Sequence, residues 1–326
     1  MSDNTSDKEQ QQQMKEIPIC GDVWLEVFAF ISPLELGHTM ALISDRFDAR
    51  VTEHFKTRKW SLGLLRIVPA FGGNGAEIVV SSGGRLPIPQ GPIPVKVIGF
   101  KKLEIRYIDR SVIEFFQRLS RLFDSSGTFV SISPNNDQSR SWDIIRQKIW
   151  PLISDNIRHL HVHAYQLDCL RQDFPAILRN CTNLRSIDGL SHAFPAEDNA
   201  NASSNQAVAK WLLTPRGDGF PKMLYYGGRM EELKRMSLFL RIFDDITNAG
   251  LPFELRNNLT RERLTFRREG LNWLLVRCPI ERDEDKWAVW EKEAIEWQGF
   301  RQWNRITIEF NNRDIGDGML PLKRKK

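Results

Sequence analysis

The segment that most constrains this fold is residues 17–60, in which three short helical patterns follow one another. Asp22 is a suitable N-cap for the first helix, Ser32 precedes the first-turn proline of the second, and Ser44 or Asp45 can cap the third. Their apolar positions recur at helical spacing: Val23, Trp24, Val27, Phe28, Ile31, Leu36, Met40, Ala41, Ile43, Phe47, Val51 and Phe55. So small a bundle cannot bury this much apolar surface in itself. The surplus either packs against the rest of the chain or forms an interface with another protein.

Four short motifs follow one another within residues 17–60. They are Ile17-Pro18, Val27-Phe28 with Phe30-Ile31, Ser32-Pro33-Leu34-Glu35-Leu36, and Ala41-Leu42-Ile43-Ser44 followed by Arg46 and Phe47. In this order they resemble an F-box, whose motif runs from an apolar-Pro pair through an apolar helix and a Pro-x-(Asp/Glu)-Leu step to an apolar-Ser-(Arg/Lys)-x-aromatic segment. The last step is one residue longer here and ends in Phe, where Trp is usual. The whole chain is similar to the single-F-box proteins of the expanded roundworm families.

The resemblance implies that residues 17–60 dock on the Skp-type adaptor of a cullin–RING ubiquitin ligase. The remainder of the chain would then select a protein substrate for ubiquitination, and the chain itself would be a non-catalytic subunit of the ligase. The apolar residues expected to contact the adaptor are Ile17, Pro18, Val27, Phe28, Ile31, Pro33, Leu36 and Ile43.

Composition and charge indicate a globular protein of the cytoplasm or the nucleus. The length of 326 residues predicts two domains. Residues 1–16 are polar and predict a disordered tail without a secretion signal, and no run approaches the roughly 18 apolar residues of a membrane span. Four cysteines without a CxxC pair fit a reducing compartment. The basic tail, 319–326, ends in Lys323-Arg324-Lys325-Lys326, which is either solvated or a nuclear import signal.

The middle of the chain predicts a repeated strand–helix unit. Residues 61–99 contain two strand patterns and a Gly/Pro-rich stretch, and we expect them to form a linker. Between residues 100 and 228, strand patterns recur at intervals of 27, 30, 27 and 36 residues, at Leu103, Val130, Leu160, Ile187 and Met223. Helical apolar patterns separate these strands, as in a solenoid. The array resembles irregular leucine-rich repeats.

Residues 229–318 predict an antiparallel meander with one helix. The expected strands are 253–257, 262–268, 271–278 and a closing strand, 305–310. The helix begins near Asp283 and carries Trp287, Trp290, Ala294 and Trp297 on one side, a stripe typical of core packing. The expected fold class is therefore α+β or α/β, with a three-helix F-box, a leucine-rich-repeat-like array and a C-terminal meander.

Three histidines alternate along one predicted strand, so their side chains share one face of the sheet. They are His159, His161 and His163. We expect them to contact the substrate together with Glu104, Arg106, Ser131, Arg185 and Asp188, because solenoids bind extended partners on the sheet face. The alternative is a metal-dependent hydrolase, but residues two apart on a strand lie about 6–7 Å from each other, which is long for a shared ion.

The remaining patterns argue against other classes of function. No nucleophile motif is present, and aromatic residues do not alternate with basic ones as they do on nucleic-acid platforms. We therefore expect no cofactor, no metal, and no nucleic-acid or membrane partner. A protein-interaction scaffold that docks on no ligase remains an alternative, with residues 17–60 merely capping the array.

Overall fold

The computed structural model divides the chain into two units, Met1–Arg58 and Lys59–Lys326, which are described separately below. The residues described are 19–31, 35–57, 59–81, 83–123, 127–163, 166, 169, 178, 181–190, 211–212, 220–226, 252–259, 261–269, 272–281, 283–295 and 304–319. The architecture is mixed α+β, as expected. Among the described helices, none has the length and apolar character needed to cross a membrane.

The first unit contains the three predicted helical segments. They are α1 (Gly21–Phe28), the π-helix η1 (Leu36–Met40) and α3 (Asp45–Thr57). Asp22 lies in the first turn of α1 and not at its N-cap, which is Cys20. Ser44 caps α3, since its Oγ accepts a hydrogen bond from the Phe47 N–H at 3.4 Å.

The core of the first unit is small. Phe28, Leu36 and Val51 are its fully buried apolar residues. The partly buried residues that pack against them are Trp24, Leu25, Ile31, Met40, Ala41, Phe47 and Phe55. Trp24 meets Phe47 edge-on, with 4.8 Å between ring centroids. The stripe that contains Trp24 and Phe28 therefore faces inward, as the helical spacing predicts.

The second unit is built on one large sheet, which has 12 strands within the described residues. Their order is β11-β12-β13-β10-β9-β8-β7-β14-β6-β2-β3-β4. The bounds are β2 (Leu64–Pro69), β3 (Ala76–Val80), β4 (Arg85–Pro87), β6 (Lys102–Ile105), β7 (Thr128–Ile132), β8 (Ile157–His161), β9 (Ser186–Leu190), β10 (Lys222–Tyr226), β11 (Phe253–Asn257), β12 (Glu262–Glu269), β13 (Asn272–Pro279) and β14 (Arg305–Ile308). A separate parallel pair joins β1 (Trp60–Ser61) to β5 (Val97–Gly99).

The centre of the sheet is parallel and contains all five strands of the predicted array. β7, β8, β9 and β10 are parallel neighbours in chain order, and β6 lies beyond β14. The antiparallel meander β11–β12–β13 adds to this sheet through β10, so it is not a separate layer. Residues 61–99, expected to be a linker, instead supply β2, β3 and β4 at the other edge.

The prediction for residues 305–310 was wrong in one respect. These residues do form a strand, β14, but it pairs in parallel with β6 on one side and β7 on the other, not with the meander. Ile306 and Ile308 are fully buried, as expected for a central strand.

Asn304 fixes the start of β14. Its side chain accepts from the Phe100 N–H at 3.1 Å and donates to the Leu122 carbonyl at 2.8 Å. The residue is fully buried and has a φ of 62°, a left-handed conformation that Asn tolerates better than most residues. Gly99 leaves room for it, because a Cβ there would lie 2.9 Å from Asn304 Oδ1.

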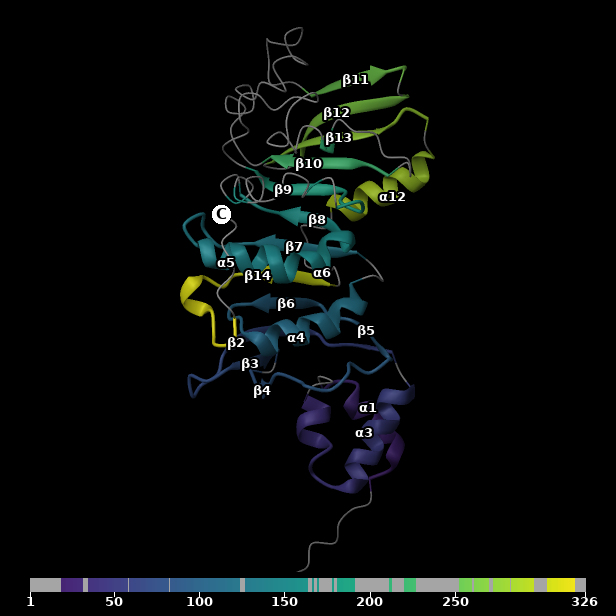
Figure 1. Ribbon diagram of the computed structural model, residues 1–326. Coiled ribbons are helices and arrows are strands. Elements are labelled where there is room, and N and C mark those ends of the chain that lie inside the picture. Colours follow the sequence, from purple (N-terminus) through teal and green to yellow (C-terminus); the bar gives the residue numbers. More distant parts are fainter. Residues whose placement is uncertain are drawn as a thin grey trace, which may run out of the picture. The chain divides into compact units, whose positions relative to one another are not determined.

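Helices follow β6 and β7 in the chain. They are α4 (Arg110–Leu119), then α5 (Ser139–Ile144) with the π-helix η3 (Ile145–Ile149) and α6 (Trp150–Ile153). Short 3-10 turns follow α4 and α6, at η2 (Ser120–Leu122) and η4 (Ser154–Asn156), and η7 (Asn312–Asp314) follows β14. Asp109 caps α4, accepting from the Val112 N–H at 3.0 Å. Figure 1 shows α4, α5 and α6 in front of the sheet, so they cover one of its faces.

The two faces of the parallel strands differ sharply in polarity. One cross-strand row is apolar and at most 2% exposed: Leu65, Leu103, Ile306, Val130, Leu160, Ile187 and Leu224. The neighbouring row, one residue further along each strand and so on the opposite face, begins at Arg66 and is polar. We call this opposite face the polar face of the sheet.

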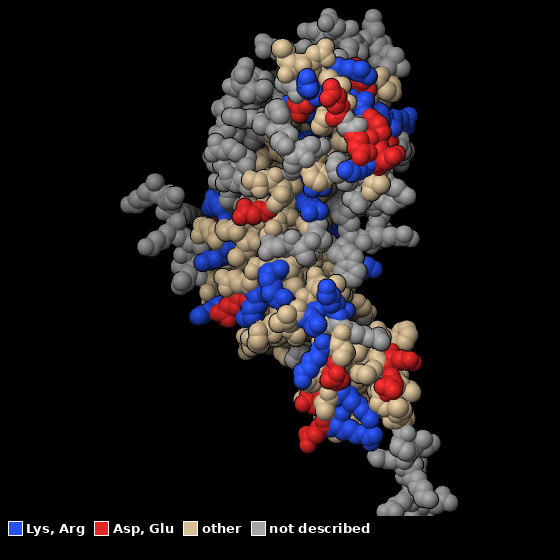
Figure 2. Space-filling view, turned by 90° about the vertical axis from the view of Figure 1, so that its right-hand side faces the viewer, with Lys and Arg blue, Asp and Glu red and all other residues tan. Residues whose placement is uncertain are grey.

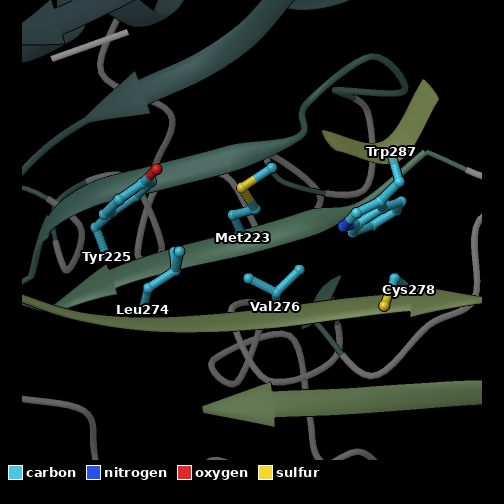
Figure 3. Close-up of a cluster of buried hydrophobic side chains, with 6 residues drawn as sticks. All are labelled: Met223, Tyr225, Leu274, Val276, Cys278 and Trp287. Carbon is cyan, nitrogen blue, oxygen red and sulfur yellow. The ribbon is translucent and has the colours of Figure 1, made fainter. Parts of the chain in front are cut away.

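A second apolar cluster packs against the sheet at β10 and β13. Figure 3 shows Met223 and Tyr225 of β10 beside Leu274, Val276 and Cys278 of β13, with the indole of Trp287 against them. Trp287 lies on α12 (Glu284–Ile295) and is buried, as its stripe predicts. The side chains of Trp290 and Ala294, and Trp297 itself, lie outside the described residues. At the height of α12 and β11–β13, acidic and basic side chains are intermixed on the surface (Figure 2).

Candidate functional site

The first unit carries large apolar side chains that its own core does not bury. Their exposed fractions are 42% for Ile19, 48% for Val23, 40% for Val27, 92% for Phe30, 79% for Leu42 and 58% for Ile43. We call these six residues the apolar surface of the first unit. Val23 and Val27 lie one turn apart on α1, on the stripe next to the inward-facing Trp24 and Phe28. The two adjacent stripes of α1 therefore have different environments, one inside the unit and one at the surface.

The structure separates the residues that were predicted to contact an adaptor. Val27 and Ile43 belong to the apolar surface of the first unit. Phe28 and Leu36 are fully buried and stabilise the core, so they present no surface to a partner. Ile31 is partly buried against the same core.

The other predicted contacts, Ile17, Pro18 and Pro33, lie outside the described residues. Conversely, Val23, Phe30 and Leu42 are exposed but were not predicted as contacts. Phe30 lies outside the helical stripe that contains Trp24 and Phe28, and this position in the sequence could have predicted its exposure.

The polar face of the sheet brings together most of the residues predicted to bind substrate. One row crosses six strands in register: Arg66, Glu104, Thr307, Ser131, His161 and Asp188. The adjacent row on the same face includes Lys102, Arg305, Phe129, His159 and Ser186. Arg185 does not belong to it, because it precedes Ser186 and its guanidinium lies over the Phe220 ring at 3.6 Å.

Glu104 is the centre of a charged cluster at the β2–β6–β14 part of this face. Its carboxylate accepts from Arg66 Nε at 2.5 Å and from the Lys102 ammonium, and Arg106 Nη2 lies 3.5 Å away. Arg106 also pairs with Glu309 at 2.8 Å. Burial acts to raise the pKa of Glu104, but hydrogen bonds from Arg66 and Lys102 outweigh it, so the pKa is below its ordinary value. Glu104 is therefore ionised at neutral pH.

Arg305 completes the cluster in a different environment. Its guanidinium lies over the Phe129 ring at 4.3 Å, and its Nε is buried with no hydrogen-bond partner in the part of the chain that the structure describes. Burial lowers the pKa of Arg305, although the negative charge of Glu104 acts in the other direction. This cation is thus held by stacking, and among the described residues it forms none of the ion pairs that hold its neighbours.

The three histidines have three different environments. His159 is buried, its Nδ1 is bonded to Ser186 Oγ, and its ring stacks on Phe129 at 5.4 Å. Burial lowers the pKa of His159 well below its ordinary value, so it is neutral. His161 Nδ1 lies 3.3 Å from Asp188 Oδ2, and the exposed His163 ring lies 5.5 Å from that of His161.

These contacts do not support the metal-dependent hydrolase. In the part of the chain that the structure describes, no group of three or more His, Cys, Asp and Glu side chains could hold a metal ion. The Nδ1 atoms of His159 and His161 are also directed to different partners, Ser186 and Asp188.

Comparison of the chain with protein-family models, with curated proteins and with solved structures found no match. The two surfaces that bear on its function are the apolar surface of the first unit and the polar face of the sheet.

Proposed function

We propose that this chain is an F-box-type substrate adaptor. The first unit docks on the Skp-type subunit of a cullin–RING ubiquitin ligase, and the second unit, a leucine-rich-repeat-like array, presents a protein substrate for ubiquitination. The chain itself is not an enzyme in this proposal, and it works in the cytoplasm or the nucleus. The observation that carries the proposal is the apolar surface of the first unit.

The size of this apolar surface supports docking on another polypeptide. Full burial of a Leu or Phe side chain contributes about 1.5–3 kcal/mol. Phe30 and Leu42 are the most exposed members, so each would contribute most of that amount on docking. Large apolar side chains that protrude from a small helical unit are typical of the anchors at protein interfaces.

The polar face of the sheet supports substrate binding by the second unit. Solenoid-like arrays bind extended partners on a face of their sheet, and α4, α5 and α6 lie against one face of this sheet (Figure 1). Arg106 and His163 are the exposed members of the predicted set and would contact the substrate directly. The buried members, Glu104, Ser131 and His159, would position their neighbours, and Asp188 would orient His161.

Capture of a purified Skp-type adaptor by the full chain tests the proposal. Phe30→Asp and Leu42→Asp place a charge on the apolar surface without altering the core. Val95→Asp and Leu259→Asp are matched controls, because these residues are 89% and 97% exposed and lie in the second unit. We expect wild type and both controls to capture the adaptor, and the double variant Phe30→Asp/Leu42→Asp to lose capture.

Two results would count against the proposal. No capture by the wild-type chain would favour an interaction scaffold that docks on no ligase. Equal capture by the double variant and by the controls would show that the apolar surface of the first unit is not the docking site.

A further inference from the structure

We infer that Arg66, Lys102 and Arg305 form an anion-binding site on the polar face of the sheet, and that it holds an acidic segment of a protein. The inference rests on the proposed function only in regarding that segment as part of the substrate. The three residues lie on neighbouring strands: Arg66 on β2, Lys102 on β6 and Arg305 on β14. Arg305 and Lys102 are direct cross-strand partners, and Arg66 is paired with Glu104, two residues from Lys102.

A buried carboxylate orders two of these cations. Glu104 is 4% exposed and accepts from both Arg66 and Lys102. Because both are tied to one carboxylate, their positions are largely fixed before a ligand arrives, which lowers the entropic cost of binding. A cluster of free surface lysines would lack this order.

The positive charges in this cluster exceed the negative ones. Arg66, Lys102 and Arg305 on β2, β6 and β14, with Arg106 directly after β6, make four cations against two described carboxylates, Glu104 and Glu309, which leaves a net charge of +2. Arg106 is shared between both carboxylates. If Arg106 is set against Glu309, then Arg66, Lys102 and Arg305 remain against the single charge of Glu104. The surplus positive charge therefore belongs to these three residues.

Arg305 is the member of the site whose charge no described carboxylate pairs with. Its Nε is buried without a hydrogen-bond partner, and no described residue forms an ion pair with it. The Phe129 ring holds the guanidinium plane in place at 4.3 Å. A fixed, partly desolvated guanidinium is suited to carboxylate and phosphate groups, which it binds through two parallel hydrogen bonds.

The rest of the face favours a peptide over a nucleic acid. Further along the same row lie Ser131, His161 and Asp188, and the Asp188 carboxylate would repel a continuous phosphate backbone. A protein segment can instead place one or two acidic side chains on the cationic cluster and neutral or basic ones beyond it.

Fluorescence anisotropy of labelled peptides with the purified full chain tests this site. The probes are a Glu-Gly repeat peptide, the same peptide with phosphoserine in place of Glu, a Lys-Gly repeat peptide, and an oligothymidylate as competitor. Arg305→Gln and Arg66→Gln each remove one guanidinium from the site. Arg85→Gln is the matched control, because Arg85 on β4 is as exposed as Arg66, 37% for each side chain, and pairs with Glu77.

We expect the acidic probes to bind and the Lys-Gly probe not to bind. Arg305→Gln and Arg66→Gln should each weaken binding on the order of tenfold, and Arg85→Gln by less than about twofold. Tighter binding of the phosphoserine probe would identify phosphate as the preferred anion, and tighter binding of the Glu probe would identify carboxylate. Both outcomes support the site.

Three outcomes would overturn the inference: equal binding of the Lys-Gly probe, equal losses in Arg85→Gln and in the two site variants, or displacement of the acidic peptides by a much tighter-binding oligothymidylate. Thermal melting of each variant checks that it is folded. The Arg66 side chain is 37% exposed, so Arg66→Gln keeps the test decisive if Arg305→Gln unfolds. None of these measurements involves the adaptor, so failure here and failure of adaptor docking are distinguishable.

Discussion

Replacement of Asn304 by Ala tests how the central strand β14 is held in the sheet. The substitution removes the acceptor of the Phe100 N–H and the donor to the Leu122 carbonyl, and both backbone groups would be left in a buried environment. Each such loss costs about 1–2 kcal/mol. Ala at a φ of 62° adds about 1 kcal/mol. We therefore expect Asn304→Ala to lower the free energy of unfolding of the second unit by about 3–5 kcal/mol.

Urea denaturation followed by circular dichroism measures this loss, with the transition of the second unit fitted separately because two units need not unfold together. Asn304→Gly should cost about 1 kcal/mol less than Ala, because glycine adopts positive φ freely. Asn258→Ala, at an exposed turn position, should stay within about 0.5 kcal/mol of wild type. A loss below about 1 kcal/mol for Asn304→Ala would refute the role assigned to this side chain.

Three further outcomes follow from burial and charge. Because the pKa of Glu104 is below its ordinary value of 4.5, its ionised form stabilises the fold at neutral pH; this contribution should fade as the pH falls below about 4.5, and Glu104→Gln should flatten that part of the denaturation midpoint plotted against pH. Burial raises the pKa of the Cys181 thiol to about 12, so iodoacetamide at neutral pH should alkylate the exposed Cys20 and spare Cys181 in the native protein, which intact-mass and peptide analysis would show. Phe28→Ala should destabilise the first unit by about 3–5 kcal/mol while Phe30→Asp changes its melting little, because Phe28 is buried and Phe30 is exposed; similar effects of the two in thermal melts would contradict this difference.

Local patterns predicted many of the elements of this fold. Helical spacing and the Ser44 cap located helices of the first unit, since these depend on residues close in sequence. The strand patterns that contain Leu103, Val130 and Leu160 predicted β6, β7 and β8 for the same reason. Strand pairing is different, because alternation in residues 305–310 indicates a strand but carries no information about its partners.

What the sequence analysis missed in the fold and at the candidate sites can also be traced to particular residues. Two strand patterns were predicted in residues 61–99 and correspond to β2 and β3, but the glycines and prolines around them favoured a linker over an edge of the sheet. Arg185 was placed with Asp188, but residues an odd number apart on a strand face opposite ways. The charged cluster around Glu104 was not predicted, because no sequence pattern shows that Arg66 of β2 meets Lys102 and Arg106 at one carboxylate.

The position of β14 has a consequence for the order in which this protein is made. When β6 and β7 have left the ribosome, β14, the strand that lies between them, has not yet been synthesised. The Phe100 N–H likewise has its acceptor, the Asn304 side chain, 204 residues downstream. During synthesis, β6 and β7 must therefore either stay apart until β14 is made, or pair with each other first and separate later so that β14 can insert between them. Any truncated product that ends before residue 304 would lack β14, so the backbone groups of β6 and β7 that pair with it would be unpaired and accessible to chaperones and proteases.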